Sequence, residues 1–77
     1  MNRQLCLNDI QPGERATVVE LRSGSGIRRR LLDIGFVENT TVECIGCAPG
    51  GDPRAFLIRG AVIALRSEDC RDIIVRR

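Results

Sequence analysis

Four cysteines are the residues of this chain with the clearest capacity for chemistry. Cys44 and Cys47 form a Cys-x-x-Cys pair, and Cys6 and Cys70 could complete a four-thiolate metal site. Zinc-binding pairs usually lie on turns, whereas Cys44 and Cys47 fall in a predicted β-strand, where an odd spacing sends side chains to opposite faces. We therefore expect reduced thiols without a metal, and the four-cysteine site stays an alternative.

Three consecutive arginines are the second feature that could bind a ligand. Arg28, Arg29 and Arg30 stand in the first turn of a short helix predicted within residues 24–36. Helix N-termini favour acidic side chains, and each exposed cation there costs about 0.3–1 kcal/mol. Because folding alone does not explain this cluster, we expect the guanidinium groups to contact the carboxylates or phosphates of a partner.

The composition argues against catalysis and against binding of single-stranded nucleic acid. The chain has no His, Tyr or Trp. It therefore lacks the commonest general base, the commonest transition-metal ligand and most platforms for stacking bases. Asp52 has no base, nucleophile or second carboxylate beside it in the sequence, and its Gly-Asp-Pro context is typical of a turn. We expect neither an enzyme nor a cofactor.

Length and charge narrow the class of protein further. With 77 residues, 43% of them hydrophobic and 29% charged, residues 1–77 are predicted to form one small soluble domain. The net charge of +2 is too small to imply a nucleic-acid partner. No apolar run approaches the ~20 residues of a membrane span, and no signal-peptide pattern opens the chain. These features predict a cytoplasmic location.

The elements that would position these residues follow a mostly β pattern. The predicted strands cover residues 15–22, 40–47, 54–59, 61–66 and 73–75. A helix lies between the first two strands, and a helical turn capped by Ser67 precedes the last. Residues 5–10 are predicted to be a tether with a turn of helix. Five short strands at close spacing predict a small antiparallel barrel.

The predicted helix has one apolar stripe that should pack it onto the barrel. Ile27, Leu31 and Ile34 are spaced i, i+4 and i+7, which places them on one helical face. Leu32 is expected to join this seam. Gly35 is predicted to end the helix in a left-handed conformation, with Phe36 and Val37 just beyond it as the candidates for the accompanying hydrophobic contact.

Four segments of the chain match, in order and spacing, the motifs of one family. They are Leu-Asn-Asp-Ile-Gln-Pro-Gly-Glu at residues 7–14, Arg-Arg-Arg-Leu-Leu-Asp-Ile-Gly-Phe at 28–36, Ala-Pro-Gly-Gly-Asp-Pro at 48–53 and Ile-Ala-Leu-Arg-Ser-Glu-Asp-Cys at 63–70. Over about residues 7–76 the chain resembles the FeoA family of ferrous-iron transport proteins. The resemblance implies an SH3-like β-barrel with the helix inserted after the first strand. It also implies a cytosolic accessory to FeoB, a membrane transporter whose cytosolic part carries a GTP-binding domain.

Two positions depart from this resemblance. Gly50 stands where the family often has a larger apolar residue, which affects any contact made through that loop tip. Cys70 stands where the family usually has alanine, which favours a small packed side chain over a metal ligand. Cys44 and Cys47 are not part of the family's pattern.

We therefore expect a non-enzymatic accessory or regulator of ferrous-iron transport that binds the cytosolic, GTP-binding region of a FeoB-type transporter. The residues predicted to contact this partner are Arg28, Arg29 and Arg30, together with Pro49, Gly51, Asp52 and Pro53 of the following loop. Two alternatives remain open at this stage. One is a small arginine-rich barrel that binds nucleic-acid phosphates, and the other is a metal-sensing module that uses the cysteines.

Overall fold

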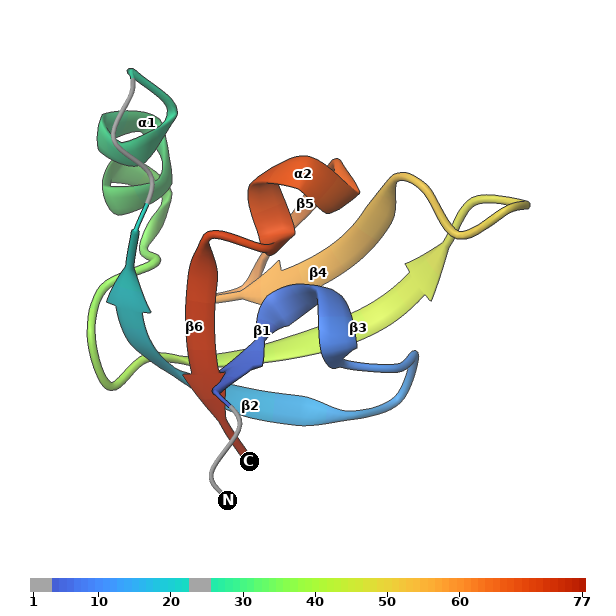
Figure 1. The fold of residues 1–77 in the computed structure, drawn as a ribbon, viewed down its shortest axis with the longest axis horizontal. Helices are drawn as coiled ribbons and strands as arrows, with labels where there is room; N and C mark the ends of the chain where they lie inside the picture. The colour runs from blue at the N-terminus through green and yellow to red at the C-terminus, as the bar shows by residue number, and fades with distance from the viewer. Residues whose placement is uncertain (1–3, 23–25) are drawn as a thin grey trace.

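The computed structural model describes residues 4–22 and 26–77, with the backbone alone at residues 26 and 27. These residues form one six-stranded antiparallel sheet and three short helices (Figure 1). The strands are β1 (Leu5–Cys6), β2 (Arg15–Leu21), β3 (Thr41–Cys47), β4 (Arg54–Ile58), β5 (Ala61–Leu65) and β6 (Ile73–Arg76). The helices are the 3-10 turn η1 (Leu7–Asp9), α1 (Gly26–Ile34) and α2 (Ser67–Cys70). The predicted mostly β class is confirmed.

The strand order is β1-β6-β2-β3-β4-β5, so six strands stand where five were predicted. The additional strand is β1, in which Leu5 and Cys6 pair with Val75 and Ile74 of β6. We predicted a tether there, because two residues are too few to show the alternation that marks a strand. The turn of helix predicted in that tether is confirmed as η1.

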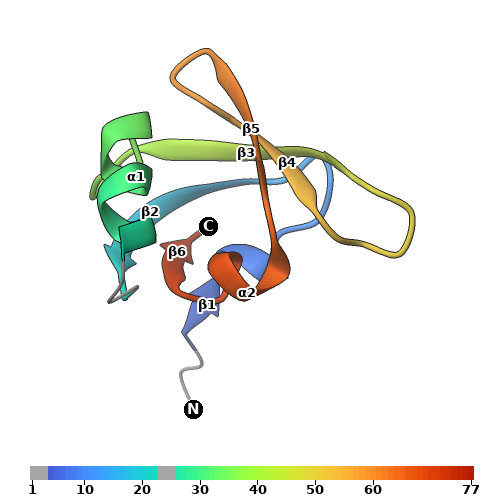
Figure 2. The ribbon, with the colours of Figure 1, turned by 90° about the horizontal axis from the view of Figure 1, so that it is seen from above.

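Two register shifts bend the sheet. One lies in β2 between Val18 and Glu20, and the other lies in β3 between Cys44 and Gly46. Such β-bulges increase the local twist and let an antiparallel sheet curl around its core. Figures 1 and 2 show the result, with α1 at one end of the curled sheet and the β3–β4 loop at the other.

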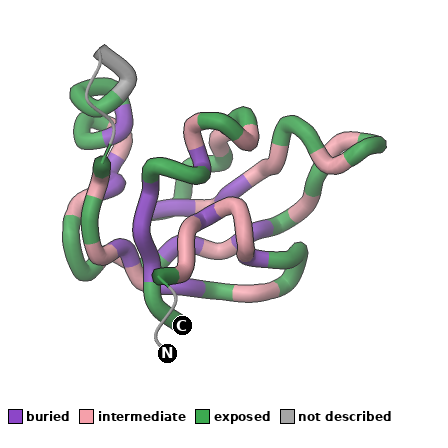
Figure 3. Tube along the Cα trace, in the orientation of Figure 1, coloured by how far each residue is buried: buried purple, intermediate pink, exposed green. Residues whose placement is uncertain are grey.

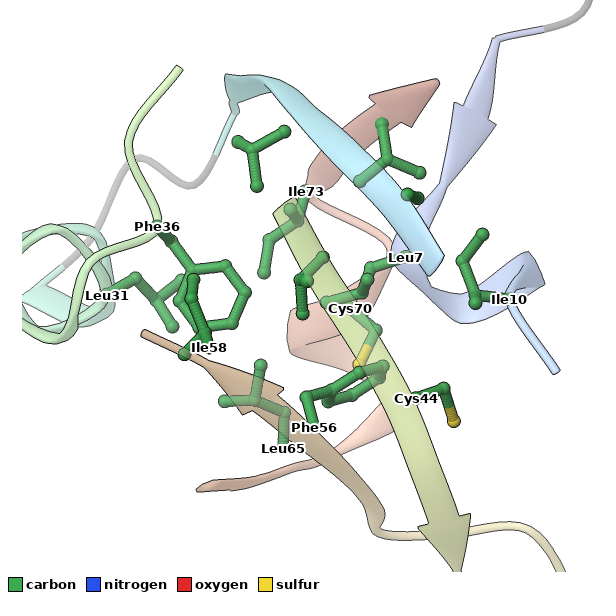
Figure 4. Close-up of a cluster of buried hydrophobic side chains, with 14 residues drawn as sticks. Leu7, Ile10, Leu31, Phe36, Cys44, Phe56, Ile58, Leu65, Cys70 and Ile73 are labelled. Atoms are coloured by element: carbon green, nitrogen blue, oxygen red, sulfur yellow. The ribbon is translucent and has the colours of Figure 1, made fainter. Parts of the chain in front are cut away.

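The core fills the inside of the curl. Phe36 and Phe56 are both 0% exposed, and Leu31 of α1 packs beside them (Figure 4). β6 has a neighbouring strand on each side and is buried along most of its length, whereas much of α1 is exposed (Figure 3). The remaining buried core residues are Leu7, Ile10, Ala16, Val18, Val42, Cys44, Ile58, Leu65, Cys70, Ile73 and Val75. Among the described residues, no helix is long and apolar enough to cross a lipid bilayer.

Candidate protein-binding surface

The three arginines of α1 lie on the surface of the molecule. Arg28, Arg29 and Arg30 are all exposed, at the start of a helix whose first turn carries no acidic residue. Within residues 4–22 and 26–77, the ion pairs join other arginines: Arg15 with Glu43, Arg22 with Glu20, and Arg77 with Glu14. The α1 guanidinium groups therefore add to the positive end of the helix dipole without an ion-pair partner in the described part of the chain.

Leu31 and Ile34 hold α1 against the sheet, as the apolar stripe predicted. Leu31 is 1% exposed and belongs to the core, and the half-buried Ile34 packs against that core. Ile27 lies in the first turn of α1, but its side chain falls outside the described residues. The structure therefore establishes the packing of α1 on the sheet at Leu31 and Ile34, in the C-terminal half of the helix.

The predicted end of α1 at Gly35 is confirmed by a double hydrogen bond. Gly35 has φ of +125°, its N–H donates to the Leu32 carbonyl at 3.1 Å, and the Phe36 N–H donates to the Leu31 carbonyl at 2.9 Å. This pairing is the Schellman motif, in which the residue after the glycine also packs on the helix. Phe36 and Leu31, both buried, make that contact and anchor the end of the helix.

Leu32 does not pack in the seam, so that prediction is wrong. Its side chain is 39% exposed. The reason is helical geometry, because Leu32 lies about 100° around the axis from Leu31 and cannot share the same stripe. It instead lines an open hollow on the β2 side of α1.

Clefts therefore run along both sides of α1. The cleft toward β2 has a volume of about 390 Å³ and includes Arg28, Leu32 and Phe36 in its walls. The cleft toward β5 has a volume of about 360 Å³. It is lined by Arg30, Leu31 and Ile34 from α1, by Ile63, Ala64 and Leu65 from β5, and by Arg66 and Asp69 at α2.

The loop between β3 and β4 lies far from the arginines, although we predicted both as partner-binding residues. α1 and this loop lie at opposite ends of the longest axis of the molecule, whose extent is 33 Å (Figure 1). Two backbone hydrogen bonds close the loop on itself, from Gly51 N–H to the Ala48 carbonyl at 2.8 Å and from Ala48 N–H to the Pro53 carbonyl at 2.9 Å. The two predicted groups thus form separate surfaces.

Asp52 of this loop makes a structural contact with the start of α2. Its Oδ1 accepts a hydrogen bond from the Ser67 N–H at 3.0 Å, at the beginning of α2. The prediction that the Ser67 side chain caps α2 is wrong, since the N-cap position is Arg66 and no side-chain cap bond forms there. An acidic group from a distant loop satisfies that amide instead.

The four cysteines do not converge on a metal site. Cys44 and Cys70 are buried, Cys6 is half-buried and Cys47 is exposed. Cys44 and Cys47 pair with Phe56 and Arg54, which are two residues apart on β4, so the register places both cysteines on one face. Our prediction of opposite faces is wrong because the bulge adds one residue between them. Their difference in exposure arises because Cys47 ends its strand.

Two of the thiols, those of Cys70 and Cys6, are held in their neutral form. Burial raises the pKa of Cys70 to about 12. The Arg54 guanidinium opposes this rise in pKa, while Asp69 reinforces it. The pKa of Cys6 is raised by burial and by the bond from its Sγ to Asp9 Oδ2 at 3.3 Å. Since metals bind thiolates, these environments disfavour ligation. Within the part of the chain that the structure describes, no three cysteine or carboxylate side chains group closely enough to hold a metal.

Removing metal is therefore expected to leave the stability of this protein unchanged. Treatment with a strong chelator such as EDTA should shift the melting temperature by less than about one degree, because no thiolate cluster contributes metal-binding energy to folding. Calorimetric melting of treated and untreated protein, with zinc measured in the released fraction, checks this. Stoichiometric zinc release with a lower melting temperature would instead establish the cysteine site.

The sequence interpretation missed the far wall of the β5 cleft. Ile63, Arg66 and Asp69 face α1 across it, although they lie 29 positions or more beyond Ile34, the last residue of that helix. Alternation along residues 61–66 predicts a strand but gives no sign of its place in the sheet. Only the strand order, with β5 outermost, brings these residues opposite the arginine-bearing helix.

Comparisons with known proteins agree on one family. A family model for the FeoA domain matches residues 5–77. A Fe(2+) transport protein A/Fe(2+) transporter FeoB fusion protein of Porphyromonas gingivalis is 33% identical over 69 residues, which cover 90% of this chain and 8% of that protein.

Two solved structures extend the likeness to the fold. The FeoA-like protein of Clostridium acetobutylicum superposes with a TM-score of 0.86 at 33% identity, covering 99% of this chain and 88% of that one. The FeoA of Stenotrophomonas maltophilia, solved with zinc and described as a prokaryotic SH3 domain protein, gives a TM-score of 0.79 at 27% identity, covering 92% of this chain and 88% of that one. The SH3-like class expected from the sequence is confirmed.

Proposed function

This chain belongs to the FeoA family, and from that premise we propose that it is a non-enzymatic accessory protein of ferrous-iron transport that binds the cytosolic, GTP-binding part of a FeoB-type transporter. The fusion protein of Porphyromonas gingivalis supports this assignment, because one polypeptide there joins a FeoA part to a FeoB part. Such a link gives two binding partners a high effective concentration.

The observation that carries the proposal is the exposed, unpaired arginine turn of α1. Three cations at a helix N-terminus destabilise the free protein slightly, and no acidic partner within the described residues offsets that cost. An acidic surface on the transporter would relieve the repulsion upon binding. Long-range attraction would also speed the encounter of the two proteins.

The proposed role does not include carrying iron. The chain has no histidine, and the raised pKa values of Cys6 and Cys70 keep these two thiols neutral. Good ligation of Fe²⁺ would require imidazole or thiolate ligands or a cluster of carboxylates. We infer that the protein acts on the transporter rather than on the ion.

Reversing the charge of Arg28 and Arg29 is expected to weaken binding to the transporter. Each lost and reversed exposed contact is worth about 1 kcal/mol, so the double change Arg28→Glu, Arg29→Glu should lower affinity about tenfold or more. Calorimetric titration with the purified cytosolic region of a FeoB-type transporter measures this. Uptake of ferrous iron in a strain lacking the native protein should fall in parallel.

The matched control reverses two exposed arginines elsewhere. Arg71→Glu, Arg76→Glu changes the net charge equally but leaves α1 intact, and it should bind within about twofold of the unaltered protein. A melting curve of each variant verifies the fold. Unchanged affinity and uptake in a folded Arg28→Glu, Arg29→Glu protein would show that the arginine turn is not the binding surface.

A further inference from the structure

The outer edge of β5 carries backbone groups that point away from the sheet. β4 and β5 are joined by the two-residue turn Arg59–Gly60, with φ of +50° and +81°, which makes Ile58 and Ala61 the first hydrogen-bonded pair. Pairs in an antiparallel ladder alternate between bonded and non-bonded. The N–H and C=O groups of Val62 and Ala64 therefore point outward, away from β4.

Nothing within the described residues covers this edge. β5 is the last strand in the sheet order, and the backbone bonds outside the helices and strands do not involve Val62 or Ala64. Val62 is 63% exposed, and Ala64 is also exposed. Proteins usually protect such edges with charges, prolines or bulges, but the β5 sequence Ala-Val-Ile-Ala-Leu contains no charge or proline and pairs without a register shift.

The edge faces the cleft between β5 and α1. Figure 2 shows β5 running from its hairpin down to α2, with α1 to its left. Leu31 and Ile34 on one side and Ile63 on the other give the cleft apolar walls. A volume of about 360 Å³ accepts the side chains of an extended segment, whereas an α-helix is about 10–12 Å across and would not fit.

The charges at this cleft select the kind of segment. The cleft is lined by the guanidinium groups of Arg30 and Arg66 and by one carboxylate, that of Asp69, so positive charge is in excess. Neither arginine forms an ion pair among the residues that the structure describes. Carboxylates on the incoming segment would neutralise them. A second copy of this chain fits poorly, because its own β5 brings no acidic residue and its α1 brings further arginines.

We propose that β5 is a docking edge for an extended segment of the transporter's cytosolic region, which adds a strand between β5 and α1. On the face that enters the cleft, this segment carries apolar side chains flanked by acidic residues, which meet Arg30 and Arg66. Strand addition of this kind takes its affinity from main-chain hydrogen bonds and its specificity from the side-chain pockets. The inference rests on the proposed function, since it names how that partner is held.

Amide hydrogen exchange on the isotopically labelled protein tests the added strand directly. The Val62 and Ala64 amides should exchange rapidly in the free protein, because no acceptor covers them. With a saturating amount of the transporter's purified cytosolic region, both should become protected at least tenfold. The same measurement is made with a synthetic peptide, Glu-Thr-Val-Thr-Val-Thr-Glu, whose Val and Glu side chains share one face, and with its N-methylated counterpart, which cannot donate to the edge and should not protect.

A substitution at the edge gives a second, independent readout. Ala64→Pro removes one outward N–H while leaving the ladder with β4 intact, since proline is accepted on edge strands when its nitrogen faces out. Affinity for the cytosolic region and for the peptide should fall at least tenfold. Ala61→Val, at an exposed residue of β5 that does not line the cleft, is the control, with affinity within about twofold of the unaltered protein.

The outcomes separate the two proposals. If the cytosolic region binds without protecting the Val62 and Ala64 amides, the docking edge is refuted and the proposed function stands. If the peptide binds and protects those amides but the cytosolic region does not bind, the edge is real and the proposed function is wrong. If neither binds, both proposals fall. The exchange measurement decides even where Ala64→Pro fails to fold.

Discussion

Replacing Leu31 with alanine is expected to lower the free energy of unfolding by about 2–5 kcal/mol, which is the usual cost of removing a buried leucine side chain. Leu31 is 1% exposed and contributes both to the core and to the contact that ends α1. Its loss leaves a cavity beside Phe36 and loosens the helix that carries the arginine turn. Urea denaturation followed by circular dichroism measures the change.

Leu32→Ala provides a control on the same helix with the same residue type. Leu32 is 39% exposed, so its truncation should cost less than about 1 kcal/mol. Equal costs for the two substitutions would contradict the assignment of the seam. A small cost at Leu31 together with a large cost at Leu32 would mean that α1 is rotated about its axis relative to the sheet.

Raising the pH above 9 is expected to destabilise the fold steeply. The Cys70 thiol has an ordinary pKa of 9.0, and burial raises the pKa to about 12 in the folded protein. The folded state therefore holds this proton more tightly than the unfolded state. Stability is full below pH 9 and falls by up to about 1.4 kcal/mol per pH unit as the pH rises toward 12. Urea denaturation between pH 7 and pH 11 in the presence of a reductant measures the slope.

Cys70→Ala isolates this contribution. The chain contains no lysine, histidine or tyrosine, so these side chains do not contribute to the dependence on pH. The variant should lose most of the dependence on pH and keep only the smaller part that comes from Cys6, whose pKa is also raised. An unchanged slope in Cys70→Ala would show that other groups control alkaline unfolding.

Sequence patterns predicted a strand or helix well where the residues that form the pattern lie within that element. Alternation marked β2 and β3 to within a residue at each end, and the helical stripe found Leu31 and Ile34. Gly35 was predictable because an L side chain rarely adopts a positive φ at the end of a helix. Each of these signals depends on the conformation of a few neighbouring residues.

Features that depend on contacts between distant parts of the chain could not be predicted from such local patterns. Leu5 belongs to a strand only because it pairs with Val75, which is far away in the sequence. Asp52 was interpreted as a turn residue. Its hydrogen bond from Ser67 depends on where the β3–β4 loop lies relative to the start of α2. The separation of this loop from the arginine turn likewise follows from the curl of the sheet. Sequence reasoning thus identified half of the candidate surface, the arginines, and missed the β5 side.

The place of β6 in the sheet has a consequence for the order of folding. The last strand of the sheet in chain order lies between β1 and β2, so Leu5 acquires its partner only when Val75 arrives, and one side of β2 stays without a neighbour until then. The hairpins of β3, β4 and β5 can form earlier from contacts that are close in the chain. On the ribosome, β1 must wait for its partner strand while most of the polypeptide is made. The pairing of β1 with β6 joins residues nearly a whole chain length apart, so this step has the largest entropic cost of loop closure. We therefore expect it to limit the rate of folding.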